Sequence, residues 1–143
     1  SLYEACCSLN DSVVMMVQEM SISLHTAALR PHREAATKYL LAATHEFYAM
    51  TVGGTPSAAC WRGLVQRGML TDEDVDVLKR FPPGMVTPVL VTWVALVIQE
   101  AVVHDTVWDS LSQPSPHIHD RLRVHLTAFM RAGYCIGQMV AMP

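Results

Sequence analysis

Hydrophobic side chains recur every three or four residues along most of the chain, which is the spacing of one face of an α-helix. The first such stripe predicts a helix that begins at Asn10 or Asp11, where a short polar side chain can cap it, and that runs to about Leu29. Pro31 is expected to end this helix, because proline cannot continue the hydrogen-bond ladder. A second stripe predicts a helix over 32–51.

Glycine and capping residues divide the middle of the chain into shorter elements. Gly53-Gly54 is expected to end the second helix, because glycine reaches the left-handed cap conformation at low cost. Ser57 can cap a third helix that closes at Gly68. Thr71 is followed by three carboxylates, which stabilise the positive end of a helix, so a short helix is predicted there.

The segment 85–103 is apolar on every helical face between Val86 and Ile98. A membrane span needs about 20 apolar residues. The usable stretch is shortened by Pro82, Pro83, Gly84 and Pro88, and Glu100 closes it. We therefore predict a buried helix rather than a membrane crossing, covered by neighbouring helices or by other subunits.

A final helix is expected from Ser115-Pro116, because proline suits the first turn of a helix. Within it, Gly133 and Gly137 have the spacing that allows another helix to approach closely. No stretch has the alternation of a β-strand, and no internal repeat is present. The pattern predicts an all-α bundle of five or six helices in which residues 1–143 form a single domain.

The chain is poor in charge. Charged residues make up only 16% of it and hydrophobic residues 51%, with a net charge of -3. Soluble domains typically carry about 25% charged residues. A small domain with so few charges leaves apolar surface exposed, which favours contact with a membrane or with other subunits. The charge balance offers no basic patch, so binding to nucleic acid is not expected. Because the chain starts at Ser1 without Met, we interpret it as a fragment or a processed product.

No catalytic motif is recognisable, and we predict that the chain is not an enzyme. The histidines His117, His119 and His125 have the composition of a metal site, but their spacing points them in different directions on a helix. A zinc site needs three or four converging ligands, so no metal ligand is assigned. The four cysteines lack the spacing of a disulfide framework and are expected to be reduced, buried thiols.

Glu100 is the most informative acidic residue in the sequence. It follows the long apolar run and is expected to face either the core or a wet cavity, because a buried carboxylate needs a partner or a role in a pathway. The alternative, which the sequence leaves open, is a helix end that emerges into solvent.

The run from Gly63 to Thr71, followed by acids and Leu78, resembles a cytosolic segment of the bestrophin anion channels. That family carries a Leu-Val-x-x-Gly-hydrophobic-hydrophobic-Thr run and then a short acidic helix. Further similarities follow the family order at Tyr3-Glu4, Asp11, Arg33 to Tyr39, Pro88 to Trp93, Arg131, Cys135, Gly137 and Pro143. The chain departs from the family at 103–105, in place of Gly-Arg-Ile-Arg-Asp, and at 139–142, in place of Asp-Trp.

The resemblance implies the cytosolic region between the second and third transmembrane helices of a homopentameric channel for chloride or other anions. Flanking segments absent here would hold it at the membrane. Ile118 or Leu122 would form a constriction, where a ring of apolar side chains can gate by dewetting. The family binds calcium elsewhere in the parent protein, so no cofactor is expected within this chain.

Two other interpretations stay open. A soluble all-helical protein-interaction module without channel activity would explain the low charge by a partner-binding face. A small metal or thiol enzyme would use the histidines and Cys135.

Overall fold

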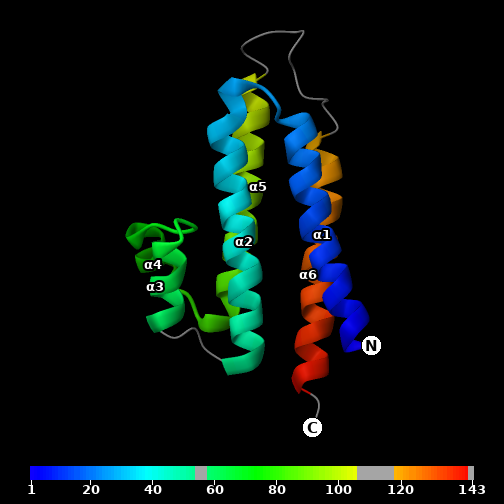
Figure 1. The fold of residues 1–143 in the computed structure, drawn as a ribbon, viewed down its shortest axis with the longest axis vertical. Coiled ribbons are helices and arrows are strands. Elements are labelled where there is room, and N and C mark those ends of the chain that lie inside the picture. Colours follow the sequence, from blue (N-terminus) through cyan, green and yellow to red (C-terminus); the bar gives the residue numbers. More distant parts are fainter. Residues whose placement is uncertain (54–57, 106–117, 142–143) are drawn as a thin grey trace.

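Four long helices form the body of the protein and run alternately up and down its long axis (Figure 1). The computed structural model describes residues 1–53, 58–105 and 118–141. Within these ranges the chain is helical and has no strand, which confirms the predicted all-α bundle. The long helices are α1 (Leu2–Ser23), α2 (Arg30–Gly53), α5 (Val86–Asp105) and α6 (Ile118–Ala141), and the short ones are α3 (Ala58–Gln66) and α4 (Asp72–Leu78).

The start of α1 differs from the prediction. Ser1 caps the helix: the backbone nitrogen of Glu4 donates to Ser1 Oγ at 3.3 Å, and the nitrogen of Ser1 donates to Glu4 Oε2 at 3.0 Å. Asn10 and Asp11 therefore lie inside α1 instead of capping it. Both are exposed, so these polar residues interrupt the apolar pattern without interrupting the helix.

The corner between α1 and α2 also differs from the prediction. α1 ends at Ser23, well before Leu29, and one 3-10 turn, η1 (Ala27–Leu29), leads into α2. Pro31 lies in the first turn of α2, where its missing N–H leaves no hydrogen bond unmade. Arg33 holds the corner, because its Nη1 donates to the carbonyl oxygen of Leu24 at 2.8 Å.

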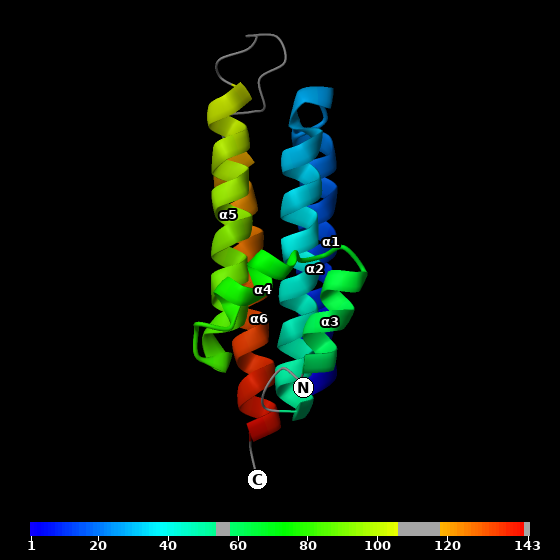
Figure 2. The same cartoon turned by 90° about the vertical axis from the view of Figure 1, so that its left-hand side faces the viewer.

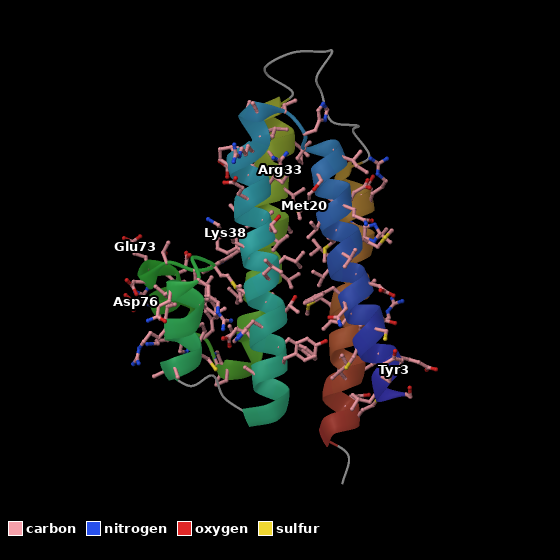
Figure 3. The ribbon with its side chains drawn as sticks, viewed as in Figure 1. Tyr3, Met20, Arg33, Lys38, Glu73 and Asp76 are labelled. Carbon is pink, nitrogen blue, oxygen red and sulfur yellow. The ribbon has the colours of Figure 1, made fainter. Side chains whose placement is uncertain are left out.

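The α3–α4 hairpin (58–78) lies across the outer side of α2 and α5 (Figure 2). Its turn contains Gly68 at φ +74°, a conformation that glycine adopts without strain. Glu73 and Asp76 of α4 point away from the bundle (Figure 3). The opposite face of the hairpin is apolar and buried at Trp61, Leu64, Leu70, Val75 and Leu78.

The predicted Thr71 cap of α4 is confirmed. The backbone nitrogen of Asp74 donates to Thr71 Oγ1 at 3.1 Å, and the Thr71 nitrogen donates to Asp74 Oδ2 at 3.0 Å. Thr71→Ala removes the side-chain acceptor and is expected to lower the free energy of unfolding by about 1 kcal/mol. Chemical denaturation measures this change. Thr71→Ser is the matched control, because serine keeps the acceptor, and an equal loss in both variants would contradict the cap.

The long helices pack as two antiparallel pairs, α1 with α6 and α2 with α5. Two contacts fix the register of the second pair. The rings of Tyr39 and Trp93 lie edge to face with centroids 5.4 Å apart, and His32 Nε2 lies 3.8 Å from Glu100 Oε1. On each helix the two contact residues are one heptad apart, which is the repeat of helices that pack side by side along their length.

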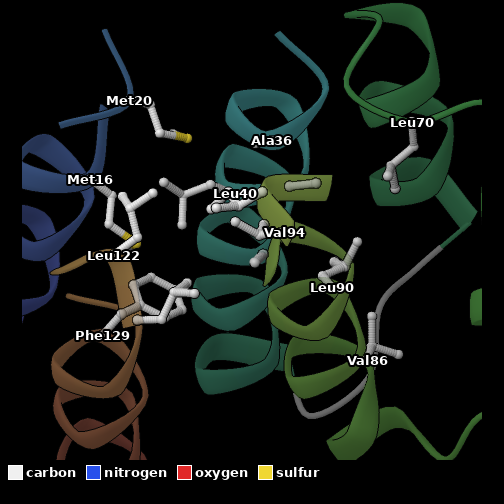
Figure 4. Packing of buried hydrophobic residues seen from close by; sticks show 14 of the residues in the cluster. Met16, Met20, Ala36, Leu40, Leu70, Val86, Leu90, Val94, Leu122 and Phe129 are labelled. Carbon is white, nitrogen blue, oxygen red and sulfur yellow. The ribbon is translucent and has the colours of Figure 1, made fainter. Parts of the chain in front are cut away.

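A single apolar core joins the two pairs and the hairpin. Figure 4 shows Leu122 and Phe129 of α6 lying together with Met16 of α1 and Leu40 of α2. Leu90 and Val94 of α5 and Leu70 of the hairpin extend the same cluster. Side chains from every described α-helix contribute to it, so residues of the described ranges form one packed unit.

The apolar helix α5 is covered on one face only. Its buried side chains follow helical spacing at Val86, Leu90, Val94, Ile98 and Ala101. The opposite face is open, with Leu96 and Val103 more than half exposed. The helix contains an apolar stretch long enough to cross a membrane. Only 28% of that stretch is buried within the chain. The predicted full burial of this segment is therefore not achieved inside this chain.

Of the two helix glycines singled out by the sequence, only Gly133 makes a close approach. A Cβ atom there would lie 3.2 Å from Cε2 of Phe47, whereas a Cβ at Gly137 would meet nothing within 4 Å. Gly133→Leu is expected to lower the free energy of unfolding by about 1–3 kcal/mol through overpacking. Gly137→Ala is expected to raise it by about 0.5–1 kcal/mol, because alanine favours the helix. Thermal unfolding of both variants tests the pair, and equal shifts would contradict the contact.

Candidate functional site

The structure places one carboxyl group in the core, at Glu46 of α2. Its side chain is 0% exposed, and neither carboxylate oxygen has a hydrogen-bond partner. A buried polar group without a partner costs free energy, and a buried charge costs far more. Such a group is retained at a cost to stability, which makes it the leading candidate for a functional residue in the described chain.

The packing of α2 on α5 sets the level at which Glu46 lies. His32 and Tyr39 of α2 face Glu100 and Trp93 of α5, and one further heptad brings Glu46 level with Val86, at the start of α5. Ala42, one turn before Glu46, is also fully buried. Glu46 therefore lies on the side of α2 that faces α5.

Burial alone raises the pKa of Glu46, to about 7. No described charge lies close enough to offset this effect. The chain has no titratable side chain between Phe81 and Gln99, the part of α5 that reaches this level. The Glu46 carboxyl is therefore balanced between its neutral and charged forms at neutral pH.

Glu100, the acid singled out by the sequence, is not buried. Its side chain is 73% exposed near the end of α5, and its one close partner among the described residues is His32, at 3.8 Å. Within this chain the alternative interpretation holds, since the residue emerges into solvent. The expectation that Glu100 faces the core is therefore not met within this chain.

The two constriction candidates have different outcomes. Leu122 is 1% exposed and lies in the core, so its side chain does not face an open surface of the chain. Leu122 is therefore a core residue of this chain, and its role in a pore wall stays a prediction. Ile118 is the first residue of α6, and its side chain lies outside the described residues.

The outer face of α6 carries a polar stripe instead. Arg123, Thr127 and Arg131 follow one another at four-residue steps and are all exposed. Neither arginine forms an ion pair with another described residue, whereas Arg121 pairs with Glu19 of α1. The stripe places two positive charges, which have no ion-pair partner among the described residues, on one exposed face of a helix.

No group of three or more metal-binding side chains gathers anywhere in the described ranges. His117 lies outside these ranges, and His125 is only partly exposed on α6. Cys6, Cys7 and Cys60 are partly buried, but Cys135 is exposed, so the prediction of buried cysteines is wrong for that residue.

A shallow hollow of about 440 Å³ opens beside α2 and is lined by Ser21, Arg33, Glu34, Thr37 and Lys38. Figure 3 shows Arg33 beside α1 and Lys38 on the other side of α2. Arg33 already donates to Leu24, and Glu34 is paired with Arg30 at 2.9 Å. Arg30, with smaller contributions from Lys38 and Arg33, holds the pKa of Glu34 below its usual range. Arg33 is therefore already engaged within the protein, and Glu34 adds a negative charge to the same hollow.

Sequence reasoning missed Glu46, although a signal was present. The residue follows Ala42 and Ala43 by four and three positions, so it continues their buried face. Helical spacing alone could have flagged it as an acid on an apolar stripe. Its lack of a partner, however, depends on residues distant in sequence and could not be read from the chain.

No family model, curated protein or solved structure matches this chain.

Proposed function

We propose that the chain is the cytosolic, pore-lining part of a pentameric, bestrophin-like channel for chloride or other anions, anchored by flanking membrane segments. The observation that carries the proposal is the open apolar face of α5, which this chain leaves uncovered. A ring of subunits would bury that face. The similarity of residues 63–71 and of the segments around them to bestrophins supports a pentameric channel as that assembly.

The polar stripe on α6 is the proposed lining of the anion path. In a ring of five subunits, Arg123 and Arg131 would each form a ring of positive charge around the axis, and positive rings raise the local anion concentration. Thr127 lies between them, and its hydroxyl donates to the Arg123 carbonyl oxygen at 2.8 Å. The proposed constriction is then formed by Ile118 instead of Leu122, because Leu122 is buried in the core.

The decisive test is electrical recording from the full protein that carries this chain. Arg123→Glu and Arg131→Glu are expected to lower the ratio of chloride to potassium permeability several-fold, measured from reversal potentials under a KCl gradient. Ile118→Ala is expected to change conductance or anion selectivity. Arg62→Glu, on an exposed position of the hairpin, is the control for surface charge. Anion currents unchanged by all three test variants would end the proposal.

A soluble helical interaction module is the alternative, because the exposed Leu96 and Val103 would equally suit the apolar face of a partner protein. Native mass spectrometry of the full protein separates the two. A five-subunit complex supports the channel, whereas a soluble monomer or dimer without anion flux in liposomes supports the module.

A further inference from the structure

The polar stripe on α6 has an exposed apolar face on each side of it. α6 packs between α1 and α5, which lie diagonally across the bundle from each other (Figure 1 and Figure 2). We call their outward surfaces the α1 face (Val14, Met15, Gln18 and Ile22) and the α5 face (Val89, Thr92 and Leu96). Ile22 is 71% exposed and Leu96 is 55% exposed. A subunit that turns α6 toward a central axis therefore turns one apolar face toward each of its two neighbours.

The two faces run in the same direction, because α1 and α5 are both antiparallel to α2 (Figure 1). The height of α1 against α2 is set by Arg33, which donates to Leu24, and by Tyr48, whose Oη donates to Asn10 Oδ1 at 3.3 Å. The height of α5 against α2 is set by the two contacts of the α2–α5 pair described above. Together these contacts fix the height of α1 relative to α5.

The two registers combined bring Gln18 level with Thr92, and Ile22 level with Leu96, within about one residue or about 1.5 Å. A closed ring relates its subunits by rotation alone, with no shift along the axis. Around an axis parallel to the helices, the α1 face of one copy therefore meets the α5 face of the next copy at the same height.

We infer that neighbouring copies of this chain join by packing the α1 face of one copy on the α5 face of the next. The inference rests on the proposed ring and names the two surfaces that close it. Such an interface is heterologous, since two different surfaces meet, and contacts of this type generate rings when the rotation closes. Each copy uses both faces, so no apolar face is left over within the ring.

The polar groups of the two faces suit this contact. No charged residue lies between Phe81 and Gln99, so the α5 face carries no charge. The Thr92 hydroxyl donates to the Pro88 carbonyl oxygen at 2.9 Å, and the hydroxyl oxygen can accept from the Gln18 amide of the neighbouring copy. That bond would give the Gln18 amide a partner when the contact removes it from water.

Charges of opposite sign lie at the lower end of the two faces. Asp11 is one heptad below Gln18 on α1, level with the start of α5, and Lys79 and Arg80 lie a few residues before α5 begins. All three are exposed, and none forms an ion pair with another described residue. Opposite charges at the same end of the contact favour correct pairing of the two faces.

Disulfide trapping in the full protein that carries this chain tests the interface. After oxidation with copper phenanthroline, Gln18→Cys combined with Thr92→Cys is expected to link chains into dimers and larger species about ten-fold above wild type, because facing cysteines at one height are within disulfide reach. Wild type corrects for the native thiols, of which Cys135 is exposed. The two new cysteines of one chain lie on opposite sides of the subunit, so the expected links join different chains.

Asp11→Cys combined with Thr92→Cys is the matched control. Asp11 is exposed on the same side of α1 as Gln18 but lies one heptad, about 10 Å, lower, which is beyond disulfide reach. Equal linking of the two pairs would overturn the level contact. Links formed by Thr92→Cys alone would place α5 against α5 and would overturn it too.

Charge reversal gives a second readout that needs no cysteine. Ile22→Glu or Leu96→Lys alone is expected to lower the assembled fraction in native mass spectrometry about ten-fold, because each variant buries an unpaired charge. The double variant is expected to recover assembly, since the two charges meet. Val124→Glu is the control, because Val124 is 66% exposed on α6 outside both faces. A double variant that assembles no better than the single variants would contradict the inference.

The interface and the channel can fail separately. Links between positions 18 and 92 without anion currents would support the interface and end the channel proposal. Anion currents without these links would overturn the interface and leave the channel proposal standing.

Discussion

Glu46→Gln is expected to make the protein more stable than the wild type at alkaline pH by about 3 kcal/mol and to leave it nearly unchanged at pH 4. The pKa of Glu46 rises from 4.5 to about 7 on folding, and each pKa unit corresponds to about 1.4 kcal/mol. Glutamine has the same shape as the neutral carboxyl and does not ionise, so the difference between the two proteins isolates the cost of the buried charge.

The direction in which pH changes the stability follows from proton binding by Glu46. Between pH 4.5 and about 7 the folded protein keeps the Glu46 proton that the unfolded chain has lost. Stability therefore falls as pH rises through this window, and the loss is complete above the folded pKa. This is opposite to the behaviour of a carboxylate held in an ion pair.

Urea denaturation at pH 4, 6 and 8 measures the effect as the difference between variant and wild type. Glu100→Gln is the control, and its difference should stay within about 0.5 kcal/mol, as expected for an exposed position. A constant difference between Glu46→Gln and wild type across the three pH values would mean that Glu46 is not buried as a neutral acid.

Leu122→Ala is expected to lower the free energy of unfolding by about 2–5 kcal/mol, because it removes a fully buried side chain from the core and leaves a cavity. The side chain lies with Met16 and Phe129 (Figure 4), so α1 and α6 would both lose contacts. Chemical denaturation at a fixed pH measures the loss.

Val124→Ala is the matched control for this change. It lies on the same helix two residues away and is 66% exposed, so the expected change is within about 0.5 kcal/mol. A loss below about 1 kcal/mol for Leu122→Ala would mean that the side chain is not in the folded core, and Leu122 would return as a pore candidate. The result thus also decides how any change in current on mutating Leu122 is interpreted.

Local chemistry explains which features the sequence by itself determined. The Thr71 cap, the Gly68 turn and the helix over 32–51 depend on contacts within a few residues, and each is present as predicted. The boundaries of α1 were wrong because capping signals are ambiguous: Ser1 with Glu4 forms the actual cap, while Asn10 and Asp11 are exposed positions within the helix. Likewise, proline can begin a helix as well as end one, and Pro31 begins α2.

Burial of single residues was decided only by the tertiary structure. Leu122 and Val124 are both apolar residues of one helix, and only the packing of α6 on α1 makes the first core and the second surface. Glu46 and Glu100 lie on facing helices, yet Glu46 is fully buried and Glu100 is 73% exposed near the end of α5. Helical spacing assigns a residue to a face, but whether that face meets protein or solvent depends on neighbours distant in sequence.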